Sequence, residues 1–370
     1  MNAVPTKDYA RQYAALLPEL RPALEAALLR DEPCLGRAVE RFEVAFAATH
    51  GEGFLGVGTG SGTDAAVLLY RALGLRPGDE VVTNAHTFAG VLTALRLARL
   101  RPVLVDPEPT TGLMAIDAVE AVIGPRTRAV LAVHLHGHPE RGRALAALCA
   151  RRGLRLLEDC AQAHGAWVDD QPVGTWGDAA IYSFHPSKNL GAFGDAGLVL
   201  TRDAAVAERV RCLRNMGKAD KYAFAEVAPV ARMDTLQAVI LSVKLRHLSA
   251  WQAHRVALAD AYLSGLSGLP GVELPHVERD TTPAWHLFVV RCAARDALRA
   301  HLAARGVQTG MHYPVAAADH APFRGRVRAP GGLVEARRRA AQGLTLPLSH
   351  EHTLDEAQRV IEAVCAWRAA

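Results

Sequence analysis

The stretch that decides the fold is IYSFHPSKNLGAFGDAG, residues 181–197, with Lys188 near its centre. It starts as a short β-type run and continues in small and turn-forming residues, which is typical of a chain leaving a strand end. A lysine at such a position is poorly placed for packing and well placed for covalent chemistry through its amine. We therefore predict that Lys188 forms a Schiff base.

A carboxylate upstream supports this interpretation. The run LRLLED ends at Asp159, 29 residues before Lys188, and Gln162 and His164 follow within one turn. The carboxyl ends of neighbouring parallel strands meet at one rim of a sheet, so the acid and the amine are expected there together. This is the arrangement that pyridoxal 5'-phosphate (PLP) requires, with the carboxylate at the ring nitrogen and the amine at the aldehyde.

A glycine-rich run, GVGTGSGTDAAVLLYRALG, covers residues 56–74 and leads from a predicted strand into a helix. Free backbone N–H groups and the helix dipole at such a junction favour a phosphate, which we place at Gly62 and Thr63 with help from Ser183. The dinucleotide fingerprint fails, because its third glycine would fall on Ser61 or Thr63. A nicotinamide-dependent oxidoreductase is therefore a weak alternative.

Two further motifs lie at predicted strand ends. Phe88 follows the strand EVVTNA (80–85), where its ring could cover one face of a planar cofactor, although a core position is the simpler reading for a lone aromatic residue. The segment HLHGH (134–138) has the alternation of a zinc site, but Gly137 and Pro139 interrupt the strand and no carboxylate or cysteine is close in sequence. We expect no metal and predict a loop at the sheet rim.

Composition excludes several classes. The 370 residues are 50% hydrophobic and 22% charged, and 42 basic against 38 acidic residues give a net charge of +4, which does not indicate nucleic-acid binding. We expect no signal peptide and no membrane span. The six cysteines include no CxxC pair, which favours a reducing, cytoplasmic location.

Strands alternating with helices predict an α/β fold with a mostly parallel central sheet covered by helices, followed by a smaller C-terminal α+β domain. We place the large domain, with its N-terminal helical segment, at residues 1–245 and the small domain at 246–370. One long helical region is expected over residues 233–267, and the small domain is expected to contain the strands WHLFVVRC (285–292), VQTGMHYP (307–314) and LTLPL (344–348).

Together these segments resemble the DegT group of sugar aminotransferases, which are fold type I PLP enzymes. The pair LEDCAQAHGA (157–166) and YSFHPSKNLGAFGDAG (182–197) is the most specific part, and SGTDA, VHLHGHP, ARMDTLQA and TGMHYP extend the likeness over nearly the whole chain. The resemblance implies Lys188 as the internal-aldimine lysine and Asp159 at the ring nitrogen. It also implies Gln162 at the ring hydroxyl and Phe88 on the ring face, with the phosphate at Gly62, Thr63 and Ser183. Positions near the amino donor or nucleotide sugar correspond to His164, Arg232, His312 and Tyr313.

The implied reaction is amino transfer from glutamate or glutamine to a keto group of a nucleotide-activated, dTDP-type keto-deoxysugar, through pyridoxamine phosphate (PMP). The resemblance also implies a homodimer with active sites at the interface. A keto-cyclitol acceptor and a catalytically weak, PLP-binding regulatory protein of the same fold remain alternatives.

The sequence departs from the family pattern in two places. Val230 stands where the family has an asparagine that reaches across the dimer to the phosphate, and valine cannot donate that hydrogen bond. After HYP, the run VAAADHAPF replaces the usual proline and histidine run, which changes the rim expected to bind the sugar.

Overall fold

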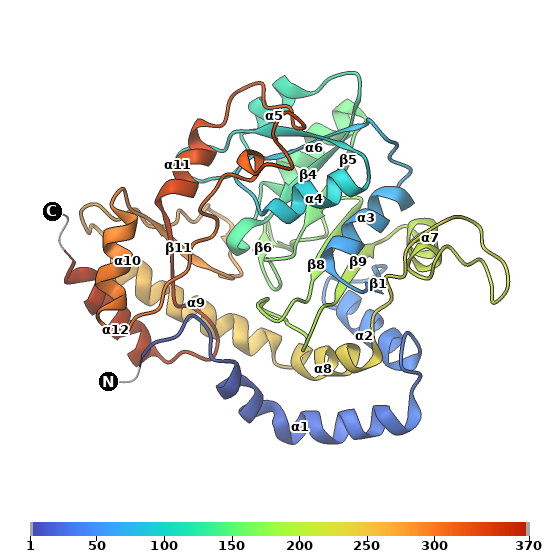
Figure 1. Cartoon of the computed structure of the whole chain (residues 1–370), viewed down its shortest axis with the longest axis horizontal. Coiled ribbons are helices and arrows are strands. Elements are labelled where there is room, and N and C mark those ends of the chain that lie inside the picture. Colours follow the sequence, from blue (N-terminus) through green and yellow to red (C-terminus); the bar gives the residue numbers. More distant parts are fainter. Residues whose placement is uncertain (1–2, 368–370) are drawn as a thin grey trace.

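The computed structural model describes residues 3–367, which form a central seven-stranded sheet covered by helices on both faces (Figure 1). The strands of this sheet are β1 (Leu55–Thr59), β2 (Glu80–Asn84), β3 (Arg101–Val105), β4 (Thr127–Val133), β5 (Arg155–Asp159), β8 (Ala179–Ser183) and β9 (Gly197–Thr201). Their order is β1-β9-β8-β5-β4-β2-β3, and β9 alone pairs antiparallel with both of its neighbours. The predicted mostly parallel α/β sheet is confirmed.

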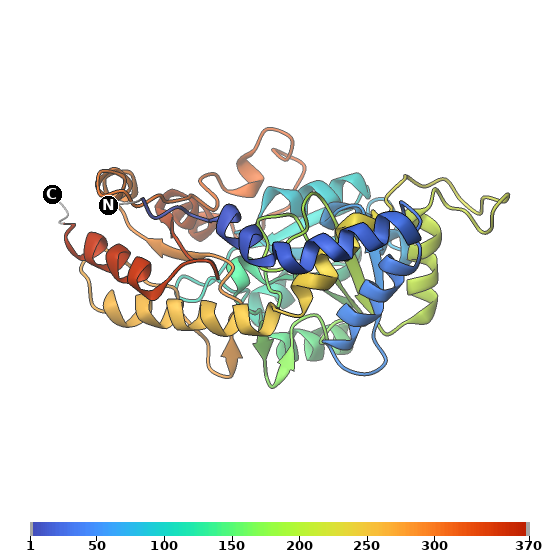
Figure 2. The same ribbon diagram turned by 90° about the horizontal axis from the view of Figure 1, so that it is seen from below.

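The helices form two layers. They are α1 (Tyr9–Arg30), α2 (Arg37–Ala48), α3 (Gly62–Ala72), α4 (Ala89–Leu97), α5 (Ile116–Val122), α6 (Gly142–Arg152), α7 (Ala204–Arg214), α8 (Thr235–Leu245), α9 (Leu248–Gly265), α10 (Arg295–Ala303), α11 (Val334–Gln342) and α12 (Leu354–Cys365). Helices α3, α4 and α7 share a core with one sheet face. Helices α2, α5, α6 and α8 cover the other, and α1 packs on α8 along the outside (Figure 2).

Alternation along the strands explains why both faces are covered. In β4, Ala129 and Leu131 face the α3 and α4 layer, whereas Val130 and Ala132 face α5 and α6. Successive side chains of a strand point to opposite faces, so a strand that is apolar at every position needs a helix on each side. The sheet is therefore held in the middle of the domain, and the polar side chains of its strands lie mostly at or next to the strand ends.

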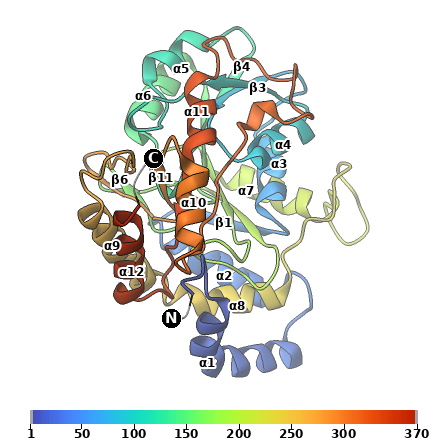
Figure 3. The ribbon, with the colours of Figure 1, turned by 60° about the vertical axis from the view of Figure 1, so that its left-hand side comes forward.

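A second core lies beside the sheet and joins α9, α10 and α12 to the antiparallel pair of β11 (Phe288–Arg291) and β12 (Gly343–Leu346) (Figure 3). A small sheet of β10 (Thr281–Thr282), β6 (Trp167–Val168) and β7 (Gln171–Pro172) connects the two parts. Val4 belongs to this second core, while Phe323 and Ala336 pack into the core of the large sheet. The domain boundary at 245/246 stays a prediction.

Two expected elements differ in the structure. The helical region over 233–267 is two helices, because the chain turns between α8 and α9 at Arg246 and His247. The expected strand over 307–314 is absent; this segment makes only isolated bridges, from Val307 to Val4 and from Gly310 to Thr345. Its partners lie on two different segments, so no continuous ladder forms. Within residues 3–367, no helix is long and apolar enough to cross a membrane.

Candidate active site

A cavity of about 670 Å³ lies at the carboxyl ends of the central strands, in the size range of cofactor and ligand sites. The structure brings most of the predicted site residues to its wall: Gly62, Thr63, Phe88, Asp159, Ser183, Lys188, His312 and Tyr313. Gln162, His164 and Arg232 do not line it.

Lys188 and Asp159 enter the cavity from neighbouring strands. Asp159 is the last residue of β5 and pairs in register with Ile181 of β8, whose chain continues to Lys188. Burial lowers the pKa of the Lys188 amine to about 8, and the negative charge of Asp159 opposes this shift. Burial raises the pKa of Asp159, against the opposing effects of the Ala161 amide and the Lys188 charge. The two side chains therefore line the same cavity, and the charge of each affects the pKa of the other.

The junction of β1 and α3 forms a cradle for an anion. Ser61 caps α3 by accepting a hydrogen bond from the Asp64 amide at 3.0 Å. Among the described residues, the Gly62 and Thr63 amides have no protein acceptor. A Cβ at Gly62 would lie 2.7 Å from the Cβ of Ser183, so only glycine lets the helix start approach β8 this closely. Two free N–H groups at a helix N-terminus beside a serine suit a phosphate.

Phe88 and Tyr313 form an aromatic wall. Phe88 directly precedes α4 and is 48% exposed, so the alternative of a core position is wrong. Its ring lies 5.2 Å from that of Tyr313, and a Cβ at Gly90 would overlap it. The Tyr313 hydroxyl accepts a hydrogen bond from Gln162 Nε2 at 2.9 Å. Gln162 therefore contacts Tyr313 of the wall without lining the cavity itself. Its contact with the ring hydroxyl of the cofactor stays a prediction.

The remaining predicted substrate residues occupy different environments. His312 lines the cavity, with Nδ1 2.8 Å from Thr345 Oγ1. His164 is buried among aromatic rings, 5.3 Å from that of Tyr182, and burial lowers its pKa to about 3. Arg232 is half-buried directly after Ala231, whose carbonyl accepts from the Gly60 amide behind the cradle. Substrate contacts of His164 and Arg232 stay predictions.

Several wall residues were not found by sequence reasoning. They are Thr6, Lys7 and Tyr9 of the N-terminal segment, His185 and Asp195 of the Lys188 motif, and His286 of the C-terminal part. Asp195 and His185 lie inside the diagnostic motif and could have been taken from it. Lys7 has no local signal, because only the tertiary structure places the N-terminal segment beside residues 187 and 188.

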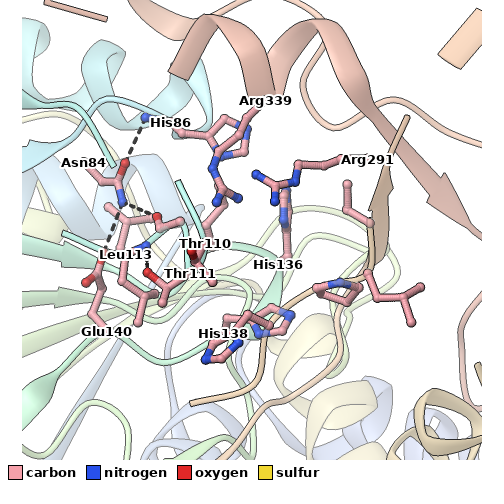
Figure 4. Close-up of a pocket in the computed structure, with 17 residues that line it drawn as sticks. Asn84, His86, Thr110, Thr111, Leu113, His136, His138, Glu140, Arg291 and Arg339 are labelled. Carbon is pink, nitrogen blue, oxygen red and sulfur yellow. Dashed lines mark hydrogen bonds between the residues drawn. The ribbon is translucent and has the colours of Figure 1, made fainter. Parts of the chain in front are cut away.

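A second, smaller cavity of about 60 Å³ is lined by His136 and its neighbours (Figure 4). Arg291 and Arg339 point toward His136 from β11 and α11, and Glu140 and Asn84 lie opposite. Both arginines also donate to the Pro109 carbonyl, so they connect the loop at Pro109 to β11 and α11. His136 Nε2 lies 3.0 Å from the His312 carbonyl oxygen, which links the two cavities through one ring.

The HLHGH segment supplies His134 to a buried cluster with Glu158 and Cys160, whose potential ligand atoms lie within 4.8 Å of one another. The HLHGH segment has no carboxylate or cysteine close to it in sequence, but the fold brings Glu158 of β5 and Cys160, the residue after β5, next to His134. His134 Nδ1 accepts from the Glu140 amide, so Nε2 carries the proton that faces Glu158. Glu158 also accepts from the amides of Gly174, Trp176 and Gly177. These hydrogen bonds connect β4, β5 and the 174–177 turn.

Comparison with known proteins identifies the family. The model of the DegT/DnrJ/EryC1/StrS aminotransferase family matches residues 17–365, so the chain belongs to this family. The resemblance recognised in the sequence motifs is therefore confirmed.

Individual relatives cover nearly the whole chain. The chain is 43% identical over 364 residues to the dTDP-3-amino-3,4,6-trideoxy-alpha-D-glucose transaminase of Streptomyces venezuelae, covering 98% of this chain and 96% of the relative. It is 41% identical over 363 residues to the erythromycin biosynthesis sensory transduction protein EryC1 of Saccharopolyspora erythraea, with coverages of 98% and 99%.

Solved structures of known proteins also match this chain over nearly its whole length. The crystal structure of S. venezuelae DesV in complex with a ketimine intermediate matches with a TM-score of 0.96, 43% identity and full coverage of both chains. NtdA from Bacillus subtilis, solved with bound cofactor PMP, matches with a TM-score of 0.90 and 29% identity, covering 98% of this chain and 85% of the other. The central sheet and its helix layers are thus those of known aminotransferases.

Proposed function

We propose that this protein is a PLP-dependent aminotransferase that moves an amino group from glutamate or glutamine to the keto group of a nucleotide-activated, dTDP-type keto-deoxysugar. The observation that carries the proposal is that Lys188, Asp159 and the Gly62 cradle share one cavity in a chain of this aminotransferase family. Relatives whose names contain a dTDP-amino sugar favour a sugar nucleotide over a keto-cyclitol as acceptor.

The residues present fit the cofactor. The amides of Gly62 and Thr63, with Ser183, would hold the phosphate, and Phe88 would cover the ring. When bound, PLP supplies an electron sink for the carbon that loses or gains a proton. Asp159 would keep a proton at the ring nitrogen through its negative charge. The Lys188 amine would hold the aldehyde carbon and, when free, would accept and return the proton that moves in the reaction.

The division into a large domain over 1–245 and a small domain over 246–370 is part of the proposal, as is a homodimer with active sites at the interface. Two separate cores support the division. Val230 is 58% exposed and lies outside the wall of the cavity, so a partner subunit could reach it but would receive no hydrogen bond from its side chain.

The test uses purified protein loaded with PLP. L-glutamate or L-glutamine should convert the pyridoxal absorbance to that of the pyridoxamine form, and a dTDP-keto-deoxysugar should restore it. Borohydride should attach the cofactor to Lys188, and Lys188→Ala should abolish both half-reactions. Full turnover in Lys188→Ala, or tight PLP binding with no conversion by any amino donor, would refute the proposal.

A further inference from the structure

The N-terminal segment is fixed along the edge of the second core. The Val4 amide donates to the Gly306 carbonyl at 2.8 Å, and the Gln308 amide donates to the Val4 carbonyl at 3.0 Å. His352 Nε2 lies 2.8 Å from the Pro5 carbonyl oxygen. These contacts hold residues 4–5 in place, so the next two residues, Thr6 and Lys7, reach the cavity that contains Lys188.

Lys7 makes one polar contact there. Its Nζ donates to the main-chain carbonyl of Ser187, the residue directly before Lys188. An ammonium group has three N–H donors and no acceptor, so two donors of Lys7 have no protein partner among the described residues. Lys244, another buried lysine nearby, is saturated by Gln12 Oε1, the Tyr13 hydroxyl and the Gly191 carbonyl at 2.7 to 3.0 Å. Lys7, unlike Lys244, therefore has N–H donors left for an additional acceptor.

The surroundings of Lys7 carry an excess of positive charge. The pKa of Lys7 is lowered to about 7, mainly by burial and also by the positive charges of Arg255, Lys188 and Lys244. Glu351 is the carboxylate that opposes this effect, but its oxygens already accept from Gln12 Nε2 and the Ser349 hydroxyl. No ion pair joins Glu351 to Lys7 in the described part of the chain. An anion entering the cavity would therefore stabilise the protonated form of Lys7.

The geometry points to Lys7 as the residue that binds the α-carboxylate of the amino donor. This inference rests on the proposed function. The donor carboxylate is attached to the carbon that reacts beside Lys188, and Lys7 contacts the neighbouring peptide group. The diphosphate of a nucleotide sugar is separated from the reacting keto carbon by further atoms of the sugar ring. A cation this close to Lys188 therefore suits the carboxylate of the donor better than the diphosphate of the acceptor.

Separate half-reactions test this inference. The PLP form is titrated with L-glutamate or L-glutamine, and the PMP form with a dTDP-keto-deoxysugar, each followed by cofactor absorbance. Lys7→Met should weaken donor binding about tenfold or more, as expected for loss of a charge-assisted hydrogen bond, with the acceptor constant changed by less than about twofold. Lys7→Arg should restore most of the donor affinity.

Two further variants separate charge from structure. Lys7→Gln keeps a donor for the Ser187 carbonyl but removes the charge, and it should lose donor affinity as Lys7→Met does. Arg21→Met removes a charge from the exposed part of α1, and it should bind both substrates as wild type does. Thermal unfolding of each PLP-loaded variant checks that the fold is retained.

Equal donor constants in wild type, Lys7→Met and Lys7→Gln would overturn the inference, as would a loss confined to the acceptor half-reaction. Wild-type protein that responds to no amino donor would instead refute the proposed function. The two failures are therefore distinguishable.

Discussion

At the scale of single residues, enclosure changes the chemistry of the Lys188 amine. An amine that stays protonated cannot attack a carbonyl carbon, and an ordinary lysine is almost entirely protonated near neutral pH. Burial lowers the pKa of Lys188 from 10.5 to about 8, although Asp159 opposes the shift. Burial thus favours the neutral amine that the proposed reaction requires.

The pH dependence of cofactor binding follows from this shift. Because the pKa is lowered, the neutral fraction of Lys188 rises as the pH increases through about 8. We expect the rate of PLP attachment to the apoprotein to rise with pH with a midpoint near 8, measured by stopped-flow absorbance. Nα-acetyl-lysine is the control, with an expected midpoint near 10.4. A midpoint for the protein close to that of the control would show that burial does not activate this lysine.

Motif spacing in the sequence was sufficient to select Lys188 and Asp159, because Asp159 ends β5, Lys188 lies in the loop after β8, and the two strands are neighbours in the sheet. The positions of Gln162 and His164 relative to the cavity were not determined by spacing. Both follow Asp159 within one turn, yet Gln162 contacts Tyr313 and His164 packs against Tyr182. The direction of a side chain in a turn depends on the residues that pack against it. The sequence pattern around the turn does not specify these residues.

At the scale of elements, the β1 and α3 junction shows how close packing places free backbone amides beside a serine. The start of α3 lies against β8 because Gly62 has no side chain. This brings the free amides of Gly62 and Thr63 next to Ser183.

Gly62→Ala should damage this junction. The new Cβ would lie 2.7 Å from the Cβ of Ser183, so one of the two elements must move. We expect about 1–3 kcal/mol lower stability and at least about tenfold weaker PLP binding. Urea denaturation and fluorescence titration measure the two effects.

The double variant Gly62→Ala/Ser183→Gly provides the control. Removal of the Ser183 side chain relieves the overlap, so stability should recover, while PLP affinity should not because the serine hydroxyl is lost. Unchanged affinity in Gly62→Ala would place the phosphate elsewhere.

Most elements were predictable because each carries its own periodicity, but two were not. Residues 307–314 have the composition of a strand, yet Val307 bridges to Val4 and Gly310 to Thr345. The break between α8 and α9 has no proline or glycine at Arg246 or His247 to signal it. Both features depend on partners that are distant in sequence.

At the scale of the whole molecule, the cavity lies where the large sheet meets the second core. Its wall combines the N-terminal Lys7, the strand ends at Asp159 and Ser183, and His312 from the C-terminal part. Apolar side chains also remain uncovered on the outer helices. Leu28 and Leu29 of α1 are 70% and 84% exposed, and Val44 of α2 is 71% exposed. Exposed apolar side chains of this size are candidates for contact with another protein.

We expect two copies to cover these residues in a homodimer. Light scattering coupled to size exclusion should give a mass of about twice the 39.6 kDa of one chain. Leu29→Glu should lower the dimer fraction without unfolding the chain, because the side chain makes little contact within one copy. A mass of one chain at micromolar concentrations would contradict the expectation.

The sequence by itself determined the class of fold, and it predicted the lysine, its carboxylate and the glycine-rich helix start as the cofactor site. Each of these depends on short-range patterns: apolar alternation, a helix start with glycines, and polar residues at strand ends. Only the tertiary structure decided that the N-terminal segment places Lys7 beside Ser187, that Phe88 faces Tyr313, and that His164 is buried away from the cavity wall. These outcomes depend on contacts between distant segments, whose energies are set by packing in three dimensions and leave no local periodicity in the chain.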